Sequence, residues 1–132
     1  MRGFLLSLIV DSNILGCTAE YRFAVMAMEN NLRVSMPLLD ASPYDCILEL
    51  ANGDLKKIQI KSTKKPEVPK GIHITLHFAN RYYELKEVDY FAIWVETFGG
   101  FYIIKNIGNM SAFRITRNGK YSKNFNNFAV IV

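Results

Sequence analysis

The sequence predicts an α/β fold in which an N-terminal helix packs on one face of a mixed β-sheet. Residues 12–30 carry apolar side chains at helical spacing, and these form a wide apolar stripe. Residues 43–62 contain two strand-forming runs around Asn52-Gly53, the strongest short-range signal for a β-hairpin. Residues 90–96 and 101–105 are apolar on both faces, which is typical of strands deep in a sheet.

Length and composition indicate a folded protein of modest positive charge. With 132 residues, we expect one domain, residues 1–132, that can enclose its own core. The chain is 50% hydrophobic and 21% charged, which argues against disorder, and its net charge of +4 suits a polyanionic partner. Two cysteines without metal-type spacing indicate a reducing compartment, so we expect a cytoplasmic protein in which Cys17 and Cys46 are core residues.

The N-terminal apolar run is too short to cross a membrane. A spanning helix needs about 18 or more apolar residues, and none is found, so we expect no membrane association. Residues 4–10 resemble a short export signal, but Asp11-Ser12-Asn13 interrupts the run. We expect residues 4–10 to form a buried strand, a helical lead-in or a contact with a second subunit.

The predicted helix carries one glutamate beside its apolar stripe. Ser12 or Asn13 can cap its start, and Asn30-Asn31 suits a left-handed end. Glu20 lies on a line with the small residues Gly16, Ala24 and Ala27, which would let the helix approach the sheet and hold Glu20 near the sheet edge. A solvated glutamate at the border of the stripe is the alternative.

The register of the hairpin decides whether three polar side chains can meet. A two-residue loop at Asn52-Gly53 would place Asp45, Gln59 and Lys61 on different faces. A three-residue loop over 52–54 pairs Asp45 with Lys61 and collects the apolar side chains of both strands on the opposite face. We therefore predict a loop of odd length or a bulge, with the three polar side chains at the open end.

A carboxylate, an amide oxygen and an ammonium group together suit a divalent metal and a phosphate. Carboxylate and carbonyl oxygens are hard ligands of the kind that Mg²⁺ prefers. An adjacent lysine can orient or deprotonate an attacking water, or neutralise the phosphate. The same spacing is met by an exposed Asp–Lys cross-strand pair with no chemical role.

Pro43-Tyr44-Asp45 followed by Gln59-Ile60-Lys61 resembles the motif of the PD-(D/E)XK nuclease superfamily. More narrowly, it is similar to the small branch with glutamine in place of the second acidic residue, the QxK type. Segments 16–20, 34–37, 42–45 and 57–63 follow the order of that branch, and 89–92 and 101–104 are similar to its later strands. The resemblance covers roughly residues 14–105.

This resemblance implies a restriction-endonuclease-like sheet and a metal-dependent DNA endonuclease that hydrolyses phosphodiester bonds with Mg²⁺ or Mn²⁺. It implies that Asp45 binds the metal and that Lys61 is the catalytic lysine. Gln59 and the Ile60 backbone carbonyl would complete the metal shell, with Glu20 beside it. Two features depart from the family: Gln59 removes one negative charge, and Pro66 and Pro69 prevent a regular helix after the lysine strand.

The remaining segments predict further strands and several phosphate contacts. Strands are expected at 32–36, 71–79 and 110–116, with one helical turn at 84–88. His73 and His77 share a strand face, but no third ligand has suitable spacing for zinc, so a wet or DNA-facing surface is expected. Residues 125–132 must pack on the sheet or across a dimer.

The candidates for phosphate contacts, which could equally be solvated loop residues, are Ser62, Lys64, Lys65, Arg81, Arg114, Arg117 and Lys120.

Three functions remain open from the sequence. The first is a Mg²⁺-dependent endonuclease acting on DNA as a homodimer or higher homo-oligomer, because cutting both strands of a duplex needs two sites. The second is a non-catalytic nucleic-acid-binding protein on the same scaffold, which Gln59 keeps possible. The third is a structural subunit whose apolar ends mark its contacts.

Overall fold

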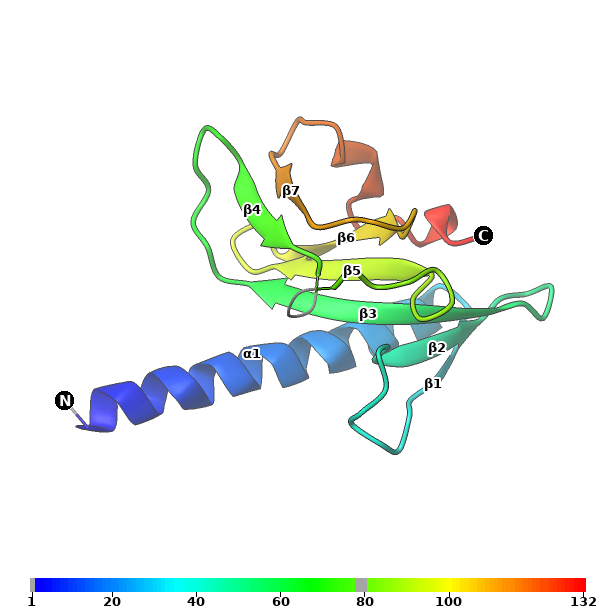
Figure 1. Ribbon diagram of the computed structural model, residues 1–132, viewed down its shortest axis with the longest axis horizontal. Coiled ribbons are helices and arrows are strands. Elements are labelled where there is room, and N and C mark those ends of the chain that lie inside the picture. The colour runs from blue at the N-terminus through cyan, green and yellow to red at the C-terminus, as the bar shows by residue number, and fades with distance from the viewer. Residues whose placement is uncertain (1, 78–80) are drawn as a thin grey trace.

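The structure is a computed structural model that describes residues 2–77 and 81–132, with side chains from residue 12 onward. In this part of the chain, helix α1 (Arg2–Glu29) lies along one face of a five-stranded sheet (Figure 1). The sheet has the order β1-β2-β3-β5-β6, and its strands are β1 (Arg33–Ser35), β2 (Cys46–Glu49), β3 (Leu55–Thr63), β5 (Tyr90–Val95) and β6 (Gly100–Lys105). β3 and β5 run parallel and the other neighbours antiparallel, so the sheet is mixed as predicted.

Helix α1 begins earlier than the sequence pattern predicts. It starts at Arg2 rather than at Ser12 or Asn13, so residues 4–10 are a helical lead-in, and their side-chain contacts lie outside the described residues. The helix ends where predicted: Asn31 has φ 64°, and the amide of Leu32 donates to the Ala27 carbonyl at 3.0 Å.

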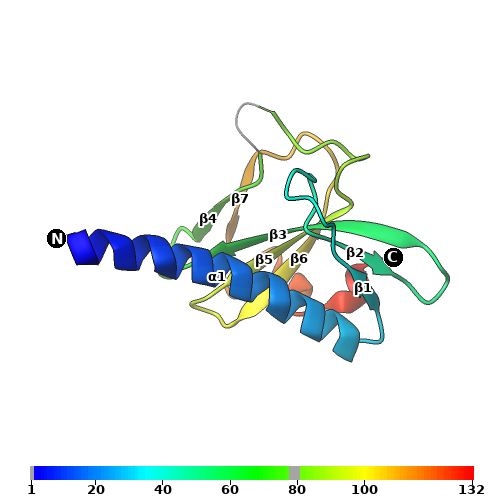
Figure 2. The same cartoon turned by 90° about the horizontal axis from the view of Figure 1, so that it is seen from below.

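The buried face of α1 is narrower than the predicted stripe. Ala19, Phe23 and Ala27 are buried against the sheet, whereas Cys17, which we predicted to be a core residue, is exposed. The prediction was wrong because the sheet covers only one side of the helix, so the outer part of the apolar stripe stays in solvent. Figure 2, which views the molecule from the helix side, shows α1 crossing in front of the strands.

The hairpin loop has an odd number of residues, as predicted, but its two strands pair in a different register. Cys46 pairs with Ile58 and Ile47 with Lys57, so the loop is Ala51–Gly53 rather than 52–54, and the predicted Asp45–Lys61 pairing is wrong. Asp45 precedes β2 and lies outside this ladder, and its amide donates to the Ile58 carbonyl at 2.8 Å. A shift by an even number of residues preserves the faces, and Cys46, Leu48, Ile58 and Ile60 are all buried as expected.

The other face of the sheet is covered by a second, two-stranded sheet. β4 (Ile72–Thr75) and β7 (Ala112–Ile115) pair antiparallel and lie across β5 and β6 (Figure 1). Their inward side chains pack with those of β5 and β6, and Leu76 continues the buried face of β4. The strand predicted over 71–79 is therefore shorter, and its last two residues, Phe78 and Ala79, lie outside the described residues.

The central strands and the C-terminal segment complete the core. β5 is buried along its whole length and β6 except for Lys105, as predicted for strands deep in the sheet, and Trp94 is a core residue. Two short 3-10 helices, η1 (Ser122–Asn124) and η2 (Phe128–Val130), follow β7. Phe128 and Ile131 pack on the sheet in the same cluster as α1, so the C-terminal run is placed on the sheet.

Within the described residues, no helix combines the length and apolar character that membrane crossing requires.

Two substitutions in α1 test how the helix meets the sheet. Gly16→Ala should raise the free energy of unfolding by about 0.5–1 kcal/mol, because the added Cβ meets no atom within 4 Å and alanine favours helix. Ala27→Leu should lower it by about 1–3 kcal/mol, because Ala27 is fully buried against the strands. Urea unfolding of both variants measures the difference, and equal effects at the two positions would contradict this packing.

Candidate active site

The site lies along β3, beyond the point where its pairing with β2 ends. β2 begins at Cys46, whereas β3 continues to Thr63, so beyond Gln59 the edge of β3 has no strand partner on the β2 side within the described residues. The Asp45 carboxylate takes that place: Oδ2 accepts a hydrogen bond from the Ile60 amide at 2.7 Å. One oxygen of Asp45 is thereby fixed at the sheet edge, while the carboxylate still has acceptor capacity for another group.

The Ile60 carbonyl and the Gln59 amide lie at the same edge. The N–H and C=O of one residue in a strand point to the same side, so the Ile60 carbonyl is directed toward the side on which Asp45 lies. Gln59 Nε2 donates to this carbonyl at 3.5 Å, a long contact. Half a turn of the terminal torsion of Gln59 would present Oε1 in place of Nε2, so the side chain can offer either a donor or an oxygen ligand.

Glu20 comes to this edge from the helix. Burial, a hydrogen bond with Asp45 and the negative charges of Asp45 and Asp40 raise the pKa of Glu20 to about 7. Two carboxylates this close favour sharing a proton when no cation is present. The pair from α1 and the hairpin therefore offers carboxylate oxygens that would help to hold a divalent cation.

Lys61 approaches from the opposite face of β3, one residue beyond Ile60. Burial lowers the pKa of its ammonium group, and the Asp45 carboxylate opposes that shift. Its Nζ lies over the ring of Tyr83, 5.6 Å from the centroid. Tyr83 is itself buried, and burial together with the charge of Asp45 raises the pKa of its hydroxyl. Asp45, Lys61 and Tyr83 thus share one electrostatic environment.

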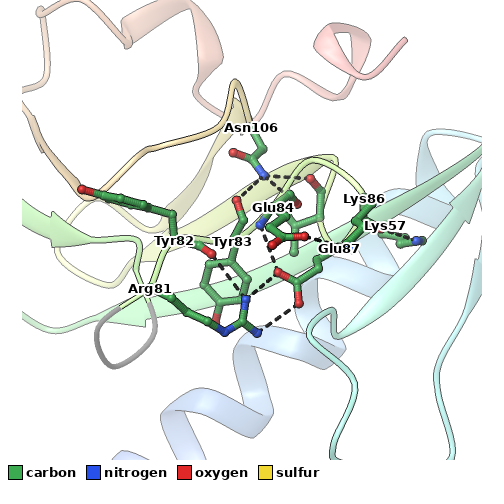
Figure 3. A network of polar contacts seen from close by, with 9 residues as sticks. Lys57, Arg81, Tyr82, Tyr83, Glu84, Lys86, Glu87 and Asn106 are labelled. Atoms are coloured by element: carbon green, nitrogen blue, oxygen red, sulfur yellow. Dashed lines mark hydrogen bonds and ion pairs between the residues drawn. The ribbon is translucent and has the colours of Figure 1, made fainter.

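A buried asparagine holds the loop that carries Tyr83. Figure 3 shows Asn106 above Tyr83 and Glu84, with dashed lines running down from its amide. Its Nδ2 donates to the carbonyls of Val88 at 2.9 Å, Tyr83 at 3.2 Å and Glu84 at 3.4 Å. Asn106 is only 3% exposed, and its Oδ1 accepts from the Gly108 amide at 3.0 Å. The backbone on both sides of the turn at 84–88 is therefore fixed to β6.

Asn106 was not identified from the sequence. An Asn two residues beyond the apolar run 101–104 was the available signal, because a polar side chain buried there needs hydrogen-bond partners.

The predicted phosphate contacts occupy several environments. Arg81 is bound to Glu87 at 2.7 and 3.0 Å (Figure 3), and Arg117 to Glu67 at 3.0 Å from both oxygens. These two cations are therefore already paired with carboxylates. Lys64 and Lys120 are exposed on loops, the latter over the ring of Tyr121, and Arg114 lies on β7.

A hollow of about 370 Å³ adjoins the site on the Lys61 side. It is lined by the end of β3 and by β4, including Lys61, Ser62, Thr63, Lys65, His73 and Thr75. The hydroxyls and ammonium groups gathered there are donors for phosphate oxygens. The two remaining candidates, Ser62 and Lys65, thus lie beside Lys61, whereas Arg81 and Arg117 do not line this hollow.

The donors at the edge of β3 suit a hard cation. Carboxylate, amide and backbone carbonyl oxygens are the ligands that Mg²⁺ and Mn²⁺ take in proteins. Among the described residues, no group of three or more His, Cys, Asp or Glu side chains gathers for a metal. Any cation here would therefore depend on amide and backbone oxygens as well as on Asp45 and Glu20.

A mixed sheet with a helix on one face, and with an acid, an amide and a lysine at the edge of two adjacent strands, defines the restriction-endonuclease-like class. The chain belongs to the PD-(D/E)XK endonuclease family, whose model matches residues 10–130. The fold is also that of a bacterial homing endonuclease, I-Ssp6803I, with a TM-score of 0.72 and 20% sequence identity. The similarity covers 91% of this chain and 92% of the other. No curated protein sequence matches the chain.

The raised pKa of Glu20 predicts how stability depends on pH. Between the ordinary pKa of 4.5 and the folded value of about 7, the folded protein keeps a proton that the unfolded chain releases. Stability without metal should therefore fall as pH rises through this interval and then level off. Glu20→Gln should remove the loss of stability that occurs in this pH interval. Glu29→Gln, at an exposed position of the same helix, should leave that loss unchanged.

The melting temperature in EDTA, measured across this interval for the three proteins, provides the test. Parallel curves for wild type and Glu20→Gln would contradict the carboxylate pair.

Removing the Asn106 hydrogen bonds should lower the stability of the protein substantially. Asn106→Ala leaves buried carbonyls without a donor, and we expect the free energy of unfolding to fall by about 2–4 kcal/mol. Asn118→Ala, at an exposed position, should change it by less than about 0.5 kcal/mol. Urea unfolding curves compare the two, and coincident midpoints would show that the network does not hold the loop.

Proposed function

We propose that this protein is a Mg²⁺-dependent DNA endonuclease that hydrolyses phosphodiester bonds, with Mn²⁺ as a substitute metal. The observation that supports this best is the open edge of β3, where Asp45, Glu20 and the Ile60 carbonyl lie together, with Lys61 beside them. Membership of an endonuclease family gives the reaction class.

Asp45, Glu20, Gln59 and the Ile60 carbonyl would hold the cation. Asp45 is already oriented by the Ile60 amide, so one oxygen position is set before any cation binds. The raised pKa of Glu20 means that its proton must leave for it to act as a ligand, so metal binding should strengthen as pH rises toward and beyond 7. When bound, the cation supplies charge stabilisation to the phosphate and lowers the pKa of water.

Lys61 would act directly on the reacting groups. Its burial favours the neutral amine, which is the form that can take a proton from water, while Asp45 favours the charged form. The ring of Tyr83 beneath Nζ restricts where the ammonium can lie. Ser62, Thr63 and Lys65 would bind the phosphates next to the one being cut, since they line the hollow beside Lys61.

A homodimer or higher oligomer follows from the reaction, because one copy supplies one site and a duplex has two strands. Helix α1 leaves large apolar side chains in solvent at positions that lie on one helical face: Ile14, Tyr21, Val25 and Met28. Four apolar side chains aligned in this way are typical of a helix that meets a second helix, and we infer that a second copy packs here.

One observation favours a non-catalytic DNA-binding protein instead. Gln59 carries no charge and turns its Nε2 toward the Ile60 carbonyl, so the site has one negative charge fewer than an acidic residue would give. Weak metal binding would leave DNA binding without cleavage. Gln59→Glu distinguishes the two functions, because it restores the missing charge at the same position.

The central test is nicking of supercoiled plasmid in Mg²⁺. Lys61→Ala should slow nicking about 100- to 10,000-fold, because it removes the group that positions or activates the attacking water. Lys105→Ala, an exposed lysine on the strand edge farthest from β2, is the matched control and should nick like wild type. Gln59→Glu should increase the rise in melting temperature that Mg²⁺ produces.

Nicking that persists in EDTA, or that is unchanged in Lys61→Ala, would exclude the proposed mechanism. A wild-type protein that binds plasmid without cutting it in Mg²⁺ or Mn²⁺, together with a Gln59→Glu variant that cuts, would establish the DNA-binding alternative.

A further inference from the structure

The β4–β7 ribbon presents an outward face that the core does not use. Its four cross-strand pairs are Ile72–Ile115, His73–Arg114, Ile74–Phe113 and Thr75–Ala112. Alternate pairs point to opposite sides, and the isoleucine pairs face the sheet. The other two pairs therefore point outward together, and His73, Thr75, Ala112 and Arg114 are all exposed.

The outward face has the chemistry of base-edge recognition. An arginine can make two hydrogen bonds to guanine, Thr and His can bond to several bases, and an alanine methyl can contact the methyl group of thymine. Neither strand contains an acidic residue, and Lys64 and Lys65 lie just ahead of the ribbon in the chain. The charge of this surface therefore complements a polyanion.

The ribbon is joined to the proposed catalytic edge by the hollow beside Lys61. His73 and Thr75 line that hollow from β4, and Lys61 and Ser62 line it from β3. A nucleic acid with a phosphate at Lys61 would therefore extend along β4. Base pairs adjacent to that phosphate would then lie within reach of the ribbon.

The ribbon is held firmly enough to read a sequence. Arg114 Nη1 donates to the Gly71 carbonyl at 3.2 Å, which orients the guanidinium, and among the described residues its other N–H groups make no hydrogen bond. Lys65 Nζ donates to the His73 carbonyl at 3.0 Å, which ties the exit of β3 to β4. Gly71 has φ +91°, and a Cβ there would lie 3.0 Å from the Ile115 carbonyl oxygen, so the two strands approach closely at this end.

We propose that the outward face of the β4–β7 ribbon enters the major groove of duplex DNA and reads the base pairs beside the cleaved phosphate. The proposal rests on the proposed function, because Lys61 fixes where the DNA lies. A two-stranded ribbon fits the major groove of B-form DNA, which is about 12 Å wide. The deep, narrow major groove of duplex RNA does not admit side chains, so duplex RNA is excluded as the partner.

The test measures sequence preference rather than activity alone. Wild-type protein is incubated with a pool of duplexes of randomised sequence, and the bound and the cleaved molecules are sequenced. Arg114→Ala should lose discrimination at one base position by roughly 5- to 150-fold while other positions keep theirs. Thr75→Val, which keeps the shape of an exposed side chain, should change the preference at a neighbouring position and provides a second variant if Arg114→Ala folds poorly.

Two controls separate base reading from phosphate binding. Arg33→Ala removes an exposed arginine on β1 and should leave every preference unchanged. Lys64→Ala should weaken binding to all sequences alike, as expected when a phosphate contact is lost.

Each remaining outcome overturns the proposal. If Arg114→Ala and Thr75→Val weaken binding equally for all sequences, the ribbon contacts phosphates and does not read bases. Binding of duplex RNA as tight as that of duplex DNA would also exclude major-groove reading. A wild type that cuts in a Lys61-dependent way but is indifferent to both ribbon variants refutes this inference alone, whereas a wild type that neither binds nor cuts DNA refutes the proposed function as well.

Discussion

The hydrogen bond from the Ile60 amide to the Asp45 carboxylate is the contact on which the candidate site depends. At 2.7 Å it occupies the first backbone donor of β3 that β2 leaves unpaired. The same contact sets one carboxylate oxygen against the strand and keeps the Ile60 carbonyl at the same edge. Glu20 from the helix and Lys61 from the strand then complete the set of charged groups. A short β2 beside a long β3 is thus the structural reason that an acid, an amide and an amine meet.

Much of this arrangement could be predicted from the sequence. The Asn52-Gly53 turn and the alternation of apolar residues identified the hairpin and its faces, and the apolar runs identified β5 and β6 as central strands. The prediction of an odd-length loop was sufficient to assign the faces. Burial depends on which face a side chain occupies, and a shift of register by an even number of residues leaves each side chain on the same face. The predicted faces of β2 and β3 were therefore right although the exact pairing was wrong.

The features that could not be predicted from the sequence depend on contacts between distant segments. Asn106 holds the loop that carries Tyr83 across more than twenty residues, and no local pattern specifies those partners. The exposure of Cys17 depends on how much of the helix the sheet covers, which composition does not reveal. The pairing of Arg81 with Glu87 and of Arg117 with Glu67 similarly decides which cations remain available, and only the folded chain shows it.

The parallel pairing of β3 with β5 also bears on the order in which the molecule folds. The β2–β3 hairpin closes a short loop and can form early, whereas β3 and β5 meet only after the intervening segment, which includes β4, has been brought back to the sheet. β4 in turn can pair only when β7, which lies near the end of the chain, has reached it. Non-local pairings of this kind cost loop-closure entropy before they gain contacts. We therefore expect the hairpin to form early and the loop that places Tyr83 beneath Lys61 to become ordered late, once β5 and β6 are in place.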